Sequence, residues 1–179
     1  MRDKIKERRV GVIIELPEPY YSEIKEYRWS FGDHMAHVVP PHVTLVSSTV
    51  LTSLKLLKDH VAKVAAQFMP ITLELHGTDT FRPEAPVVYL KVVRGYEQCK
   101  ALAEALSRGL LKLEPEFPYH PHVTVAFKVS DEKLDEAQEM LKDYSVEFKV
   151  KELKVFEHQE EDIWHIVKEI PLGANQPLA

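Results

Sequence analysis

The sequence predicts an α+β protein of two similar lobes, with antiparallel sheets around a central cleft and helices outside. The first observation is a repeated order of strand, helix, short strand, helix and strand, which occurs twice along the chain. A duplication at this scale is expected to place two like lobes about an approximate two-fold axis. The second is that the predicted strands alternate apolar and polar residues, unlike the continuous apolar strands of a doubly wound parallel sheet. The third is length, because 179 residues, 45% of them hydrophobic, fit one bilobal domain over residues 1–179.

The first repeat covers about residues 10–76. β-Branched residues identify its strands, and apolar side chains at helical spacing identify its helices. Ser53 can cap the second helix, and Pro70 ends it. The expected elements are a strand at Val10–Leu16, a helix at Tyr20–Phe31, a short strand at His42–Ser47, a helix at 54–68 and a strand at Ile71–Leu75.

The second repeat covers about residues 86–156, after a polar connector at Gly77–Ala85. Its expected elements are a strand at Val87–Val93, a helix at Tyr96–Leu113, a short strand at His122–Phe127, a helix that starts at Ser130 or Asp131 and ends near Tyr144, and a strand at Val146–Val150. One more strand is expected at about 163–170. Residues 171–179 have no periodicity and are expected to form a flexible tail.

Composition excludes several classes of protein. The net charge of −5 and the pI near 6.0 argue against a protein coated with positive charge to bind duplex DNA. The single cysteine, Cys99, excludes an intramolecular disulfide framework and a four-cysteine zinc site. Neither a secretory signal nor an apolar run of membrane-spanning length is recognisable. We therefore expect a cytoplasmic protein that does not bind membranes, and no obligate protein partner is evident.

The most specific feature is a short motif that occurs twice. Pro41-His42-Val43-Thr44 is followed 80 residues later by Pro121-His122-Val123-Thr124, in the same middle strand of each repeat. In a strand, residues i and i+2 point to the same face, roughly 6–7 Å apart. Each histidine therefore projects together with its threonine, and a two-fold axis would bring the two pairs face to face across a groove.

This constellation suits phosphodiester chemistry without a metal or another cofactor. One neutral imidazole can take a proton from the attacking water or hydroxyl, while the other, protonated, gives a proton to the leaving oxygen. Hydroxyls of Thr44 and Thr124 can donate to the phosphate oxygens. The expected partner is an RNA end or a nucleotide that carries a 2′,3′-cyclic phosphate. The sequence does not assign the acid and the base, and the alternative is that both histidines are packing residues.

The paired motifs His42-Val43-Thr44-Leu45 and His122-Val123-Thr124-Val125 resemble those of the two-histidine phosphoesterase superfamily, and within it the bacterial 2′-5′ RNA ligase-like proteins. The resemblance extends from about Val10 to Leu172 and includes the stretch Gly77-Thr78-Asp79-Thr80-Phe81-Arg82-Pro83. It implies a bilobal α+β fold with a central cleft, catalytic histidines at His42 and His122, and phosphate-binding threonines at Thr44 and Thr124. The implied activities are hydrolysis of RNA 2′,3′-cyclic phosphates and formation of 2′-5′ linkages, without a metal.

One departure from that family concerns the substrate. Family members that act on RNA ends often carry an arginine in His-x-Thr-x-Ala-Arg, whereas here Ala126 is followed by Phe127 and then by Lys128. Strand alternation would place Phe127 and Lys128 on opposite faces, so Lys128 is not expected to replace that arginine in the cleft.

Further candidates and alternatives complete the hypothesis. Phe81 and Arg82, in the loop between the repeats, are the preferred residues for binding a base and a phosphate, ahead of Tyr119 and Trp164. One alternative is a module that binds an RNA end or nucleotide without turnover. Another is a metal-dependent phosphohydrolase with ligands at Asp33, His34 and His37. The spacing His120-x-His122 could supply a second pair of metal ligands for that alternative. Of the other histidines, His60, His76 and His158 are interpreted as surface residues and His165 as an inward-facing packing residue.

Overall fold

The computed structural model describes residues 8–114, 117–158 and 163–173. In chain order the elements are β1 (Arg8–Glu15), α1 (Tyr20–Ser30), the 3-10 helix η1 (His34–His37), β2 (His42–Leu51), α2 (Leu54–Ala65), β3 (Ile71–Thr80), β4 (Val87–Arg94), α3 (Tyr96–Ser107), β5 (His122–Phe127), α4 (Asp131–Met140), β6 (Ser145–Val150), β7 (Glu152–His158) and β8 (Trp164–Pro171).

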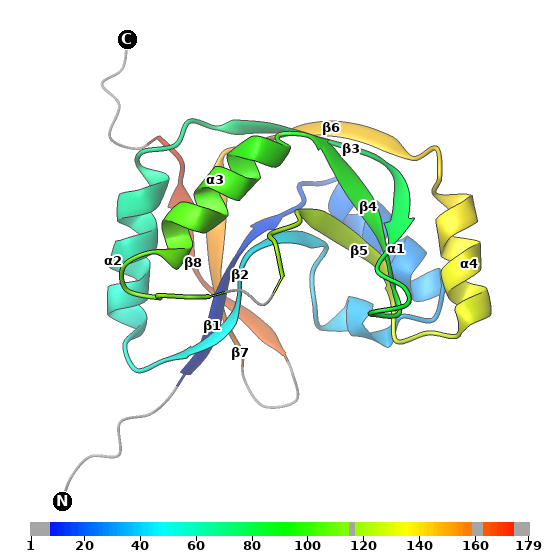
Figure 1. Cartoon of the computed structure of the whole chain (residues 1–179), viewed down its shortest axis with the longest axis horizontal. Coiled ribbons are helices and arrows are strands. Elements are labelled where there is room, and N and C mark those ends of the chain that lie inside the picture. Colours follow the sequence, from blue (N-terminus) through cyan, green and yellow to red (C-terminus); the bar gives the residue numbers. More distant parts are fainter. Residues whose placement is uncertain (1–7, 115–116, 159–162, 174–179) are drawn as a thin grey trace, which may run out of the picture.

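All eight of these strands belong to one curled antiparallel sheet, in the order β6-β3-β4-β5-β2-β1-β7-β8 (Figure 1). The antiparallel α+β class is confirmed, and the expected sheets of the two lobes are continuous with each other. They join where β2 pairs with β5, through the single residue pair Val43 and Val123. Four strands lie on each side of this junction, which is where an approximate two-fold axis would pass.

The two halves of the sheet do not contain the same strands as the two halves of the sequence. Strand β3 ends the first repeat, yet it lies between β4 and β6 of the second. Its place beside β1 is taken by β7, a strand that the sequence analysis missed. The sequence of β3 does not show which strands it pairs with, because an alternating strand has the same apolar face beside any neighbour. The positions of β3 and β7 are therefore decided by long-range pairing.

The helices also connect the two halves. Helix α1, which precedes β2, packs against β5, whereas α3, which precedes β5, packs against β2. The buried faces include Ile24 and Phe31 of the α1 segment and Leu102 and Leu106 of α3. Each strand that carries a motif is therefore supported by a helix from the other half of the sequence.

Several predicted boundaries were wrong. Helix α3 ends at Ser107 rather than Leu113, because Gly109 follows with a left-handed backbone (φ +70°). The segment expected as a flexible tail begins in ordered structure, since Pro171 ends β8 and Leu172 donates its N–H to the Lys151 carbonyl at 2.9 Å. Residues 174–179 of that tail lie outside the described residues.

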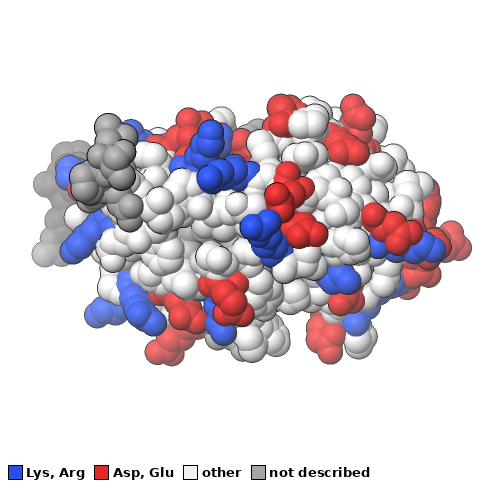
Figure 2. Space-filling view, turned by 90° about the horizontal axis from the view of Figure 1, so that it is seen from above, with Lys and Arg blue, Asp and Glu red and all other residues white. Residues whose placement is uncertain are grey.

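The distribution of charged side chains on the surface agrees with the net charge of −5 calculated from the sequence. On the face seen from above, Lys and Arg are interspersed with Asp and Glu among the described residues (Figure 2). No continuous basic track crosses that face. In the part of the chain that the structure describes, no helix is both long enough and apolar enough to cross a membrane.

Candidate active site

The two motifs meet at the centre of the sheet. Because β2 and β5 are antiparallel with Val43 opposite Val123, the register continues with His42 opposite Thr124 and Thr44 opposite His122. Both valines are fully buried beneath the sheet, so the four polar side chains share the other face. Diagonal neighbours on one face are roughly 7–8 Å apart. The register therefore places the two histidines on either side of a space the size of a phosphate group.

A β-bulge follows each motif at the equivalent position. In β2, Ile13 pairs with Thr44 and Val12 with Val46, so Leu45 is an extra residue. In β5, Tyr89 pairs with Thr124 and Val88 with Ala126, so Val125 is an extra residue. A bulge shifts the alternation of the side chains that follow it. Ser47 and Phe127, three residues after the two threonines, consequently face the same cavity as the motifs.

Backbone carbonyls orient both imidazoles in the same way. Nδ1 of His42 lies 2.6 Å from the Pro40 carbonyl oxygen, and Nδ1 of His122 lies 2.7 Å from the His120 carbonyl oxygen. A carbonyl only accepts, so each Nδ1 carries the hydrogen and each Nε2 of a neutral ring is left with a lone pair. The hydroxyl of Thr44 then donates to Nε2 of His42 at 3.2 Å. Both rings thus present their basic nitrogen on the side away from the anchoring carbonyl.

Both histidines favour the neutral form in the free protein. The pKa of His42 is lowered to about 4, mainly by burial and in smaller part by the neighbouring Arg28 and His122, against the opposing hydrogen bond to Pro40. Burial also lowers the pKa of His122, again against its backbone hydrogen bond. A bound phosphodiester anion would act in the opposite direction, because a negative charge nearby favours the imidazolium.

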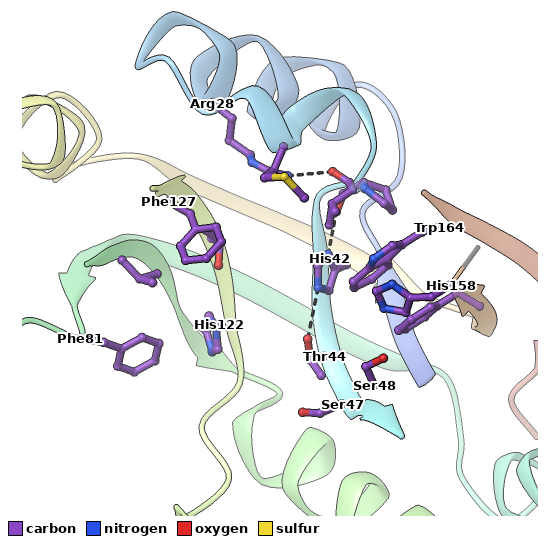
Figure 3. A pocket seen from close by; sticks show the side chains of 16 residues that line it. Arg28, His42, Thr44, Ser47, Ser48, Phe81, His122, Phe127, His158 and Trp164 are labelled. Atoms are coloured by element: carbon purple, nitrogen blue, oxygen red, sulfur yellow. Dashed lines mark hydrogen bonds between the residues drawn. The ribbon is translucent and has the colours of Figure 1, made fainter. Parts of the chain in front are cut away.

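The two motifs open into a cavity of about 470 Å³ (Figure 3). Five of the six predicted site residues line it: His42, Thr44, His122, Thr124 and Phe81. Trp164, a weaker candidate, lines it as well. The other lining residues are Arg28, Met35, Val39, Pro40, Ser47, Ser48, Val87, Phe127, Phe156 and His158.

Two predicted nucleotide-binding residues lie elsewhere. Arg82 is not among the described residues that line the cavity, because its guanidinium donates to Asp135 of α4 at 2.8 Å and to Gln138 at 3.2 Å. Tyr119 is also absent from the described lining, and its hydroxyl donates to the carbonyl of Thr44 at 2.8 Å. Tyr119 therefore connects the segment before β5 to β2, beside the single residue pair that joins these strands.

Arg28 is the cavity residue that sequence reasoning missed. Its side chain is almost fully buried, where Nε donates to Asp33 at 2.9 Å and Nη1 to the Val39 carbonyl at 2.8 Å. Of the described residues that line the cavity, only Arg28 is a lysine or arginine. The sequence contained a pattern that could have identified Arg28 as a buried residue. Arg28 stands four residues after Ile24 and three before Phe31, which places it on the apolar face of α1. Lys128, by contrast, is exposed and does not line the cavity, so it does not replace the arginine of the family motif. The bulge at Val125, rather than simple alternation from His122, turns Phe127 toward the cavity and Lys128 away from it.

The residues expected as ligands in the metal-dependent alternative, Asp33, His34 and His37, have other partners in the structure. The carboxylate of Asp33 is buried against Arg28 and also caps η1 by accepting from the Met35 N–H at 3.0 Å. His34 and His37 are exposed and pack against the ring of Trp29 instead. Within residues 8–114, 117–158 and 163–173, no three His, Cys, Asp or Glu side chains are grouped to hold a metal ion.

Two other histidine predictions were wrong. His158 was interpreted as a surface residue, but it lines the cavity and its ring centroid lies 5.1 Å from that of Trp164. His165 was expected to face inward and is exposed. Both errors arise in the β7–β8 hairpin, whose first strand was not predicted.

Comparison with known proteins identifies the class to which this fold and site belong. The model of the 2′-5′ RNA ligase superfamily matches residues 16–162, so the chain belongs to this superfamily of two-histidine phosphoesterases. A protein of Bacillus pumilus named "Putative phosphoesterase" is 29% identical over 169 residues, which cover 93% of this chain and 92% of that protein.

Solved structures share the fold at low sequence identity. The crystal structure of E. coli LigT complexed with 3′-AMP matches with a TM-score of 0.64 at 18% identity, over 93% of this chain and 99% of that one. The crystal structure of TT0787 of Thermus thermophilus matches with a TM-score of 0.63 at 19% identity, over 94% of this chain and 100% of that one. The predicted family and fold are therefore confirmed.

Proposed function

We propose that this protein is a metal-independent phosphoesterase that opens nucleotide or RNA 2′,3′-cyclic phosphates by two-histidine acid–base catalysis. The observation that carries the proposal is the pair of imidazoles on one sheet face, each held by a backbone carbonyl at Nδ1 so that Nε2 is left for proton transfer. Two such nitrogens can serve the attacking and the leaving oxygen of one phosphorus atom.

The proposed reaction balances with water as the only co-reactant. One imidazole takes a proton from water as the new P–O bond forms, and the other donates a proton to the ribose oxygen as its bond to phosphorus breaks. Hydroxyls of Thr44 and Thr124 donate to the phosphate oxygens on which charge increases. Because both histidines are neutral in the free protein near pH 7, the substrate anion has to raise the pKa of the imidazole that acts as acid.

The test uses adenosine 2′,3′-cyclic monophosphate with EDTA present throughout. We expect turnover by the wild type and a loss of about 10²–10⁴-fold in kcat for His42→Ala and for His122→Ala, which is the usual contribution of general acid–base catalysis. His76→Ala is the matched control, because His76 is exposed on β3 outside the cavity.

Three outcomes would overturn the proposal. Equal turnover by the wild type and His42→Ala would remove the histidine from the chemistry. Activity that is lost with EDTA and restored by a divalent metal would favour metal-dependent hydrolysis. Saturable binding of the nucleotide without any turnover would favour a binding module, the alternative that the sequence left open.

A further inference from the structure

Arg28 is hydrogen-bonded to the segment that anchors His42. Its Nη1 donates to the Val39 carbonyl at 2.8 Å, and the next carbonyl along the chain, that of Pro40, accepts from Nδ1 of His42 at 2.6 Å. Figure 3 shows these two bonds in series between Arg28 and His42. The guanidinium is therefore one residue away from the group that fixes the imidazole.

Two prolines make this segment dependent on groups that donate to its carbonyls. Pro40 and Pro41 have no backbone N–H, so neither can donate a main-chain hydrogen bond. The Pro41 carbonyl accepts from the Leu16 N–H at 3.1 Å, which holds the downstream end of the segment at the end of β1. The upstream end is connected to α1 by Arg28, through the carbonyl of Val39.

The guanidinium is itself held in a closed loop of four hydrogen bonds. Nε of Arg28 donates to Asp33 at 2.9 Å, and the same carboxylate accepts from the Met35 N–H at 3.0 Å. The Met35 carbonyl accepts from the Val39 N–H at 2.9 Å, and the Val39 carbonyl accepts from Arg28. The side chains of Arg28 and Asp33 are 4% and 0% exposed. A planar guanidinium can bridge the two ends of this loop, whereas a lysine has a single terminal nitrogen.

The second motif has a side chain bonded to the equivalent carbonyl. Tyr119 precedes its motif histidine by three residues, as Val39 does, and the Tyr119 carbonyl accepts from the hydroxyl of Tyr96 at 3.4 Å. Arg28 lies in the last turn of α1, whereas Tyr96 is the first residue of α3. The two donors thus come from different helix positions and residue types, which indicates a requirement of the site rather than a remnant of the duplication.

We propose that Arg28 is a positioning residue for the proposed reaction. Through Val39 it holds the Pro40 carbonyl where that carbonyl keeps the hydrogen of His42 on Nδ1, so that Nε2 is left for proton transfer. Arg28 does this without binding the substrate, because Nε and Nη1 already donate to the protein and its charge is balanced by Asp33. The kinetic consequences rest on the proposed function, whereas the tautomer of His42 is a property of the free protein.

The first measurement is the tautomer of both motif histidines, by ¹⁵N NMR of the imidazole nitrogens at neutral pH. Both rings are uncharged there, because burial lowers both pKa values. The variant is Arg28→Met combined with Asp33→Leu, which leaves no uncompensated buried charge. We expect hydrogen on Nδ1 of both rings in the wild type. In the double variant, His42 should populate both tautomers while His122 stays unchanged.

The second measurement is turnover of adenosine 2′,3′-cyclic monophosphate with EDTA present. In the double variant kcat should fall by about 10- to 100-fold, since a small misplacement of a catalytic group has an effect of this size. KM should change by less than about threefold, because no contact with the substrate is removed. Arg28→Lys keeps the charge and the Asp33 cap but not the planar fork, so it should show the same changes to a smaller extent.

The matched control is another arginine–carboxylate pair. Arg94 and Glu147 are 2.7 Å apart, and their side chains are 60% and 53% exposed. Neither is among the described residues that line the cavity. Arg94→Met combined with Glu147→Leu should leave both tautomers, kcat and KM as in the wild type.

Several results would overturn the positioning role. These are a wild-type tautomer of His42 in the double variant, an equal change at His42 and His122, or a raised KM with unchanged kcat, which would make Arg28 a substrate-binding residue. Wild-type behaviour of Arg28→Lys would show that charge alone is sufficient. If the double variant does not fold, Arg28→Lys decides by the same readouts. If the wild type does not turn over the nucleotide, the proposed function fails and the tautomers alone decide the role of Arg28.

Discussion

The low pKa of His42 predicts a specific loss of stability in acid. The unfolded chain protonates this histidine near its ordinary value of 6.5, whereas the folded chain protonates it only at about 4. Between these values the unfolded state binds more protons, so the free energy of unfolding rises with pH and is lost as the pH falls from about 6.5 to about 4. At about 1.36 kcal/mol per pH unit, the contribution is up to about 3 kcal/mol. It is an upper bound, because the ring lies at the cavity wall rather than deep in the core.

The assay is urea unfolding of the wild type and His42→Asn at several pH values between about 7 and 4.5, which covers most of the range from 6.5 to about 4 over which the two states differ in bound protons. The asparagine amide can still donate to the Pro40 carbonyl, but it has no proton to gain in this range. We expect the wild type to lose up to about 3 kcal/mol more than the variant over the range. His76→Asn, at an exposed position, should parallel the wild type. Parallel curves for the wild type and His42→Asn would refute the reasoning, because His42 would then titrate alike in both states.

Three further substitutions test the supports of the site by urea unfolding. Arg28→Met should lower the free energy of unfolding by about 3–5 kcal/mol, because it leaves the buried Asp33 carboxylate without its counter-ion. The double variant with Asp33→Leu should lose less stability than Arg28→Met alone. A larger loss in the double variant would contradict this explanation. Tyr119→Phe should cost about 0.5–1.5 kcal/mol, because it removes the part-buried hydrogen bond to the Thr44 carbonyl. Unchanged stability would show that this hydrogen bond does not hold the two strands. Gly11→Ala should cost about 1–3 kcal/mol, since its Cβ would lie 2.4 Å from a ring atom of Phe156; a neutral effect would mean that the ring can move.

Part of the site could be predicted because its chemistry is local in the sequence. A histidine and a threonine two residues apart in a strand share a face wherever that strand is placed. The valine between them has to point into the core. The motif occurs in the equivalent strand of each repeat. This repetition indicated that the two histidine–threonine pairs lie close together in the folded protein. His42 and His122 therefore needed no knowledge of strand order to be selected.

Other features depended on pairings that no local pattern contains. The bulges at Leu45 and Val125 follow from the register with β1 and β4, and they direct Ser47 and Phe127 into the cavity. Arg82 stood in the expected loop, but α4 presents a carboxylate that binds its guanidinium. The contact could not be anticipated from the sequence, since the two residues are 53 positions apart.

The sequence by itself determined the α+β class, the duplicated order and the two histidine–threonine pairs, because the side-chain period of a strand and the spacing of a helix are local properties. The tertiary structure decided that β3 crosses to the second half and that β7 takes the place beside β1. It also decided that Arg28, Phe156 and Trp164 meet at the cavity. These depend on which apolar faces are buried against each other, a choice made by the whole chain at once.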